Sequence, residues 1–348
     1  MRSTTKPRIR NRWRAALALA VLISANAALF GGSVDFPAKT WGLSFGNSPE
    51  FTGLRFNFRD NKVVRVTGVN ITFWQPGKDN KDSVVHGVSL GIVPGAGELR
   101  GIQLGLLGVA ANKSADGISI GGLGVAAGTS LFGIAAGGLG VAAGSDLTGF
   151  AFGGLGVGAG TDLLGVAAGG LGVGAGGNLT GIAIGGVGVG AGGSVAGITI
   201  GGIGAGAGHD MAGINIGGVG LGAGENLTGL NIAGLAAGAG GRLAGLTVCG
   251  LAAGAKEVVG LTVGGLAVGG QVLKGAQIAG AMVHVPKDGR LVGLAASPFN
   301  FIKGAQTGLA IGIVNYAWHV DGVQIGLVNI VRDNPRYLKV LPVFNTSF

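Results

Sequence analysis

The sequence predicts an all-β protein whose tandem 16-residue repeats form a parallel β-solenoid with irregular caps, and three observations carry this prediction. The unit repeats without insertion, since its first glycine recurs at every sixteenth position from Gly101 to Gly245. Glycine supplies 78 of the 348 residues and disfavours helix by roughly 1 kcal/mol each. Each unit holds two short runs with the period-two alternation of strands. Such a strict repeat indicates one supersecondary unit stacked on copies of itself.

The first 27 residues predict export. Six basic residues precede an apolar run over 15–23, and Ala25-Asn26-Ala27 fits a small-x-small cleavage pattern. We expect a signal peptide over 1–27, because the apolar run is shorter than the roughly 20 residues of a spanning helix. This segment supplies six of the nine net positive charges, which leaves +3 for residues 28–348. The basic composition is therefore no evidence for nucleic-acid binding.

Residues 28–100 carry the repeat in an irregular form. Its glycine-apolar-variable-apolar opening occurs at Gly53, Gly68 and Gly87, with unequal spacing. This region also concentrates bulky aromatic residues, namely Trp41, Phe45, Phe51, Phe58, Phe73 and Trp74. The end of a solenoid needs bulky side chains to close its core, so we expect an N-terminal cap followed by irregular repeats.

Residues 101–259 hold the regular repeats, and each position of the unit has a predicted role. Written from Gly181, the unit is GIAIGGVGVGAGGSVA. Positions 2 and 4 are apolar and position 3 is often polar, so we expect a strand with 2 and 4 inward and 3 outward. Glycines at 5 and 6 predict a corner. A second strand would turn positions 7, 9 and 11 inward, and position 15 would return to the core after a turn at 12–14.

Residues 260–348 return to irregular repeats and end in a predicted C-terminal cap. Asn315 and Asn329 occupy matching positions of two successive units, where stacked asparagines can hydrogen-bond between coils. The final strand contains Pro342, which lacks a backbone donor and predicts an edge or cap strand.

Both ends of the chain resemble a known family. GLAIGIVN at 308–315, GVQIGLVN at 322–329, LPVFNTSF at 341–348 and GLRFNFRDN at 53–61 are similar to the GLQIGLVN-type units of the glycine-rich surface-repeat family of exported bacterial proteins. The middle departs from that pattern, since the Gln and Asn of the family unit are replaced by Gly and Ala. The resemblance implies a location at the bacterial envelope or cell surface and offers no catalytic residues to carry over.

An outer-membrane β-barrel is the alternative fold. About eighteen glycine-apolar units could be as many strands, and the sequence ends in Phe348, a common last residue of such barrels. A barrel of this size needs a polar lumen face along every strand, which the middle repeats lack. The solenoid is therefore the favoured interpretation.

We expect no catalytic, cofactor-binding or metal-ligating residues. A calcium-binding roll needs an aspartate two residues after its last glycine, where this chain has residues such as Ala126 and Ala142. Asp146 and Asp162 share position 14 and would stack as a carboxylate pair. We favour instead a ladder of Asx turns at this position, which continues through Asn178, Asp210 and Asn226.

The histidines and the cysteine add no site. His86, His284 and His319 lie in separate irregular units without the spacing of zinc ligands. Cys249 is the one cysteine, so an intramolecular disulfide is excluded, and we expect a small buried thiol.

These observations predict an exported, non-enzymatic structural or surface-interaction protein of the bacterial cell envelope, located at the outer membrane or cell surface. The sugar-cleaving β-helices need acids and bases clustered outside, and the predicted outward positions hold neither. The partner would be an unknown surface or envelope component, with outer-membrane contact and side-by-side self-association left open, and with no cofactor or nucleic acid. A β-barrel pore or transport protein is the alternative function.

Overall fold

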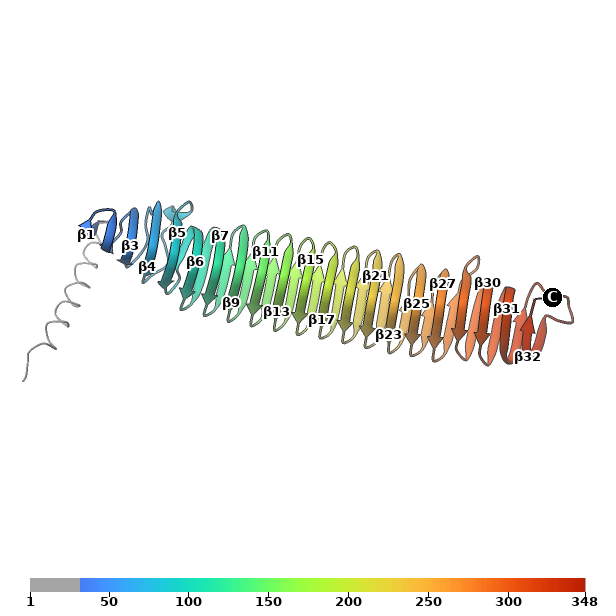
Figure 1. The fold of residues 1–348 in the computed structure, drawn as a ribbon. Coiled ribbons are helices and arrows are strands. Elements are labelled where there is room, and N and C mark those ends of the chain that lie inside the picture. The colour runs from blue at the N-terminus through green and yellow to red at the C-terminus, as the bar shows by residue number, and fades with distance from the viewer. Residues whose placement is uncertain (1–31, 348) are drawn as a thin grey trace, which may run out of the picture. The chain divides into compact units, whose positions relative to one another are not determined.

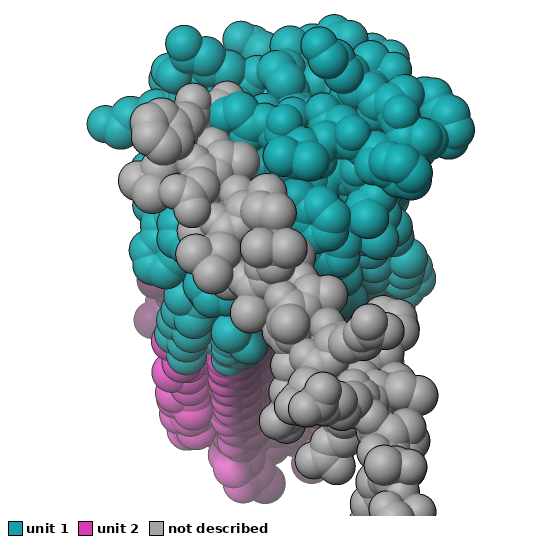
Figure 2. Space-filling view, turned by 90° about the vertical axis from the view of Figure 1, so that its left-hand side faces the viewer, with its two compact units in different colours: residues 1–159 teal, residues 160–348 magenta. Residues whose placement is uncertain are grey.

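A computed structural model describes residues 32–347, which form two compact units, 32–159 and 160–347 (Figure 2). The predicted signal peptide over 1–27 lies outside the described residues. The division between the units falls inside the regular repeats, between residues 159 and 160. None of the described residues forms a helix long and apolar enough to cross a membrane.

The first unit is built from strands and one short 3-10 helix. Its elements are β1 (Ser33–Ala38), β2 (Trp41–Gly46), β3 (Glu50–Asn57), β4 (Arg65–Thr72), η1 (Lys78–Asn80), β5 (Val84–Gly91), β6 (Gly95–Gly105), β7 (Gly108–Gly121), β8 (Gly124–Ala127), β9 (Ser130–Gly137), β10 (Gly140–Ala143), β11 (Leu147–Gly153) and β12 (Gly156–Ala159).

The second unit contains strands throughout. They are β13 (Leu163–Gly169), β14 (Gly172–Ala175), β15 (Leu179–Gly185), β16 (Gly188–Ala191), β17 (Val195–Gly201), β18 (Gly204–Ala207), β19 (Met211–Gly217), β20 (Gly220–Ala223), β21 (Asn226–Ala233), β22 (Ala236–Ala239), β23 (Arg242–Cys249), β24 (Ala252–Gly254), β25 (Glu257–Gly264), β26 (Ala267–Gly269), β27 (Val272–Ala279), β28 (Met282–Val285), β29 (Arg290–Ala296), β30 (Phe299–Ile311), β31 (Val314–Val331) and β32 (Val340–Thr346).

Each regular coil consists of a long strand and a short strand, and both pair in parallel with their counterparts in the next coil (Figure 1). For example, β15 pairs with β17 from Leu179↔Val195 onward, and β16 pairs with β18 from Gly188↔Gly204 onward. The register step of 16 residues equals the sequence repeat, which confirms the predicted β-solenoid. Neighbouring strands of an outer-membrane barrel are antiparallel, so the barrel alternative for the fold is wrong.

Antiparallel strands occur at the two ends of the described chain. In the first unit β1 pairs antiparallel with β2, and in the second unit β32 pairs antiparallel with β31. Strand β32 contains Pro342 and has β31 as its neighbour, which is the edge position predicted for a strand with proline.

The predicted directions of the first strand of the repeat are wrong, because the structure inverts them. Position 3 faces inward, and Ala183 and Asn215 are both fully buried. Positions 2 and 4 face outward, as Ile184 with 42% exposure illustrates. Position 7 also faces outward, whereas Val189 at position 9 and Leu179 at position 15 point inward as predicted.

The corner explains which face of the long strand is inside. Gly185 at position 5 and Gly188 at position 8 flank this tight corner, and a Cβ atom added to Gly185 would lie 2.1 Å from the carbonyl oxygen of Gly188, so this coil requires glycine there. Positions 3 and 5 share a face of the strand, so the buried Gly185 places Ala183 inside and Ile184 outside. Alternation alone shows which residues share a face and leaves the choice of the inner face open.

Candidate functional site

The most extensive surface feature of both units is a set of outward apolar rows. We call positions 2 and 4 the face rows, because they lie on the outer face of the long strands. In the second unit their exposed members include Ile184, Ile214, Ile232, Leu246, Val248, Leu261, Ile278, Ile311, Val323 and Ile325. Parallel pairing in register places equivalent members about 4.8 Å apart.

A third apolar row runs along the corner between the long and short strands, at position 7. We call it the corner row. In the first unit it comprises Leu107, Leu123, Leu139 and Leu155, and in the second unit Leu171, Val187, Ile203, Val219, Leu235, Leu251 and Leu266. Its members in the second unit are 42–55% exposed, compared with 38–44% for the face-row members named above.

The charged side chains of residues 160–331 occupy the opposite edge of the coil. From residue 160 to 331, every Asp, Glu, Lys and Arg falls at positions 12–16, in the turn after the short strand or the first residues of the next long strand. We call this the turn edge. Lys274 Nζ lies 2.6 Å from Glu257 Oε1 there, and this hydrogen bond holds the pKa of the Glu257 carboxyl below its ordinary value. The coil is therefore amphipathic across its width.

Polar side chains fill part of the interior. In the second unit, position 3 carries a buried row in successive coils, namely Thr199, Asn215, Asn231, Thr247, Thr262 and Gln277. Asn215 Nδ2 donates to Asn231 Oδ1 at 2.9 Å, and Asn231 Nδ2 donates to Thr247 Oγ1 at 3.3 Å. These hydrogen bonds between coils satisfy the Asn231 amide, whereas the Thr199 hydroxyl and the Asn215 amide oxygen have no partner among the described residues.

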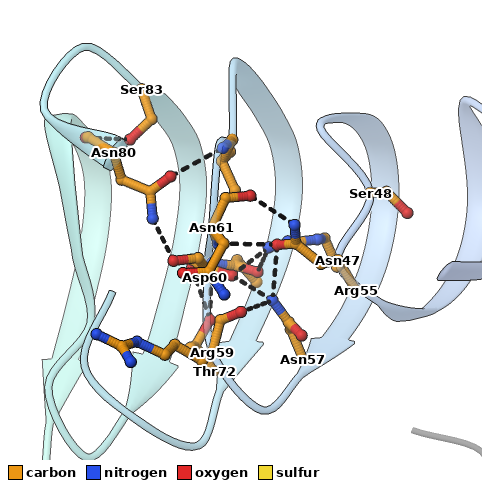
Figure 3. A network of polar contacts seen from close by, with 12 residues as sticks. Asn47, Ser48, Arg55, Asn57, Arg59, Asp60, Asn61, Thr72, Asn80 and Ser83 are labelled. Atoms are coloured by element: carbon orange, nitrogen blue, oxygen red, sulfur yellow. Dashed lines mark hydrogen bonds and ion pairs between the residues drawn. The ribbon is translucent and has the colours of Figure 1, made fainter. Parts of the chain in front are cut away.

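The first unit contains a buried ion pair inside a denser polar network (Figure 3). Arg55 is fully buried, and its Nη1 donates to Asp60 Oδ1 at 2.6 Å and to Asn70 Oδ1 at 2.8 Å. The Asp60 carboxylate also accepts hydrogen bonds from Asn57, Asn70 and Thr72 at 2.9–3.0 Å. Charge pairing and this set of donors make burial of the pair tolerable.

The sequence analysis did not identify this network. Its signal was present in GLRFNFRDN, where Arg55 occupies position 3 and Asp60 follows five residues later. The outward assignment of position 3 placed Arg55 in solvent, whereas the true inward direction requires a buried counter-ion for it. The network links β3, β4 and the loop between them, so we assign it a structural role in this end of the first unit.

The acidic turn residues form hydrogen bonds to the following coil. In the second unit, Asp162 Oδ1 accepts from the backbone N–H of Asn178 at 2.7 Å, and Asn178 Oδ1 accepts from Ser194 N at 3.0 Å. Asp210 Oδ1 accepts from Asn226 N at 3.2 Å in the same way. These hydrogen bonds join residues 16 apart in successive coils, whereas an Asx turn bonds the backbone within its own turn, so the predicted Asx turns stay a prediction. Asp146 belongs to the first unit and Asp162 to the second.

The other residues considered for chemistry lie apart from one another. Within residues 32–347, no three His, Cys, Asp or Glu side chains gather to hold a metal ion. His319 Nδ1 lies 3.3 Å from Asp333 Oδ2 at an exposed site of the second unit. Burial raises the pKa of the Cys249 thiol, as expected for a small apolar packing residue.

The hollows of the first unit include one of about 330 Å³, which is lined by Thr40, Glu50, Phe51, Thr52, Val64 and Arg65. A smaller one, about 100 Å³, is lined by Arg65, Thr67, Val84, His86 and Arg100. Arg100 is already paired with Glu98 at 2.7 Å, and neither hollow brings together an acid, a base and a nucleophile in hydrogen-bond contact.

A comparison of the chain with protein-family models, curated proteins and solved structures found no significant match.

Proposed function

We propose that this chain is an exported, non-enzymatic structural or surface-interaction repeat protein of the bacterial cell envelope, and that it acts through its outward apolar rows. This assigns the contact surface to the face and corner rows in place of the polar row at position 3, which is buried. Export is supported by the signal-peptide pattern of 1–27, and the envelope location by the resemblance of both chain ends to surface-repeat proteins.

The observation that carries the proposal is the size of the outward apolar surface. The second unit has eleven successive long strands among its described residues, and their extended part from position 2 to position 5 spans about 10 Å at ~3.3 Å per residue. At ~4.8 Å per coil this strip covers about 500 Å², and the corner row adjoins it. Monomeric soluble proteins rarely expose contiguous apolar patches above a few hundred Å², and larger patches mark interaction sites. A surface of this extent supports binding by area rather than in a pocket.

Fractionation of bacterial cells that express the full chain tests the proposal. We expect the protein in the envelope fraction with Ala28 as its first residue. A variant with three polar replacements in one face row, Ile182→Thr, Ile198→Thr and Ile214→Thr, should lose most of this association. The matched control carries threonine at position 16 of the same sheet, in the turn edge, with the changes Ala196→Thr, Ala212→Thr and Ala244→Thr. This control should stay in the envelope fraction.

Recovery of the intact chain from the cytoplasm would contradict the proposed export. Equal envelope association of the face-row variant and the control would contradict the assigned contact surface.

A further inference from the structure

We propose that the apolar edge of the second unit, formed by its face rows and corner row, inserts into the hydrocarbon of one leaflet of a lipid bilayer, with the turn edge at the headgroups. This inference rests on the surface-interaction function proposed above and names its partner. Four observations on residues 160–347 support it.

The first observation is the separation of polarity across the coil. Large apolar side chains occupy positions 2, 4 and 7, whereas Asp, Glu, Lys and Arg from 160 to 331 are confined to positions 12–16. An element with an apolar side and a charged side binds in the plane of a membrane interface, with the apolar side buried among acyl chains.

The second observation is the depth of the apolar edge. Positions 2 to 5 of the long strand are extended and span about 10 Å, and the chain turns at positions 6 and 7. An element bound at a membrane interface buries its apolar side about 5–10 Å, and one leaflet of a bilayer offers about 15 Å of hydrocarbon. The apolar edge therefore fits within one leaflet, while the turn edge reaches the headgroup region.

The third observation concerns the backbone of the corner. A backbone N–H exposed to hydrocarbon without a partner costs several kcal/mol. At the corner after β15, Gly186 N donates to Gly169 O at 3.1 Å and Val187 N donates to Leu171 O at 2.7 Å. Ile203 N in the next coil donates to Val187 O at 2.7 Å. These donors are satisfied by the preceding coil, so burial of the corner in lipid leaves none of them unpaired.

The fourth observation distinguishes lipid from a second copy of the chain. Two flat sheets pack face to face about 10 Å apart, and such packing would cover the face rows. The corner row projects along the edge of the sheet, and in such a pair its Leu and Val side chains would stay in water. Fluid acyl chains cover a face and an adjoining ridge together, so the exposed corner row favours a bilayer.

Flotation of the full chain with phosphatidylcholine vesicles tests the inference, because these zwitterionic vesicles offer hydrocarbon without net charge. We expect the wild-type chain to float with the vesicles. Four corner replacements, Leu171→Gln, Ile203→Gln, Leu235→Gln and Leu251→Gln, should lower the partition coefficient about fivefold each and several-hundredfold together. The matched control carries four glutamines at position 16, Thr180→Gln, Ala196→Gln, Ala212→Gln and Thr228→Gln, and should bind like the wild type.

A depth measurement gives a second readout that does not depend on residues 1–31. A bimane fluorophore on Val219→Cys in the corner row should be quenched by phosphatidylcholine with brominated acyl chains. The same fluorophore on Glu225→Cys in the turn edge should not be quenched. If the fluorescence at each of the two sites were the same in brominated vesicles as in ordinary vesicles, the inference would be overturned.

The remaining outcomes separate this inference from the proposed function. A chain that does not float but sediments as a dimer, and becomes monomeric with the four corner glutamines, would overturn the lipid inference in favour of a second copy. The proposed surface-interaction function would then still stand. A chain that binds neither vesicles, nor itself, nor isolated envelopes would overturn both.

Discussion

The Asp60→Asn replacement should destabilise the first coils of the first unit, because it removes the charge that compensates the buried Arg55. The Asp60 carboxylate accepts four side-chain hydrogen bonds and is 3% exposed. In asparagine one of the two oxygens becomes an NH₂ group that faces donors, so two of these hydrogen bonds are lost. Removing one partner of a buried ion pair costs about 3–5 kcal/mol.

Hydrogen exchange measured by mass spectrometry is the appropriate assay, since a repeat array opens locally and a single unfolding midpoint would hide the effect. A loss of about 3 kcal/mol corresponds to roughly 150-fold faster exchange of the amides in β3 and β4. Strand β9 lies several coils away and should keep its protection, because repeats contact their neighbours alone.

Asp79→Asn provides the matched control. Asp79 is exposed in η1, so the same chemical change there should leave the exchange of β3 and β4 unaltered. If Asp60→Asn and Asp79→Asn gave the same exchange rates in β3 and β4, the structural role assigned to the buried network would be refuted.

Three further outcomes are expected. Gly197→Ala should cost at least about 2 kcal/mol, seen as roughly 30-fold faster hydrogen exchange of the amides in β15 and β17, because φ is +125° and the new Cβ would lie 2.0 Å from the oxygen of Gly181. Lys274→Met should return the pKa of Glu257 toward its ordinary value in an NMR titration. The depressed pKa stabilises the fold above the unfolded-state pKa, and this contribution is lost as pH falls through the folded-state pKa, so the variant should lack that acid-dependent loss. Cys249 should react with iodoacetamide at pH 8 far more slowly in the folded chain than in urea, since burial raises its thiol pKa.

The sequence predicted the periodic part of the fold because backbone pairing follows the repeat. A step of 16 residues between equivalent glycines became the register of the parallel strands. The inward direction of positions 9 and 15 was also predictable. The hydrogen bond from Asn315 Nδ2 to Asn329 Oδ1, at 2.7 Å, confirms the predicted contact between stacked asparagines.

Alternation could not predict which face of the long strand points inward, because the residues on both faces repeat with period two. Hydrophobicity favoured Ile184 as the inner residue. The tight corner between Gly185 and Gly188 requires glycine at residue 185, which shares the inner face with Ala183. The candidate contact surface therefore came from the structure, since it depends on the geometry of this corner.

Cysteine accessibility at neighbouring residues tests the central claim most directly, namely that the apolar side chains lie outside and the small and polar ones inside. Ala183 is fully buried and Ile184 is 42% exposed, and both belong to β15. We predict that a maleimide added to the purified chain in buffer labels Ile184→Cys rapidly and leaves Ala183→Cys as protected as the native Cys249. Rapid labelling of Ala183→Cys together with protection of Ile184→Cys would contradict the inverted coil and every proposal built on it.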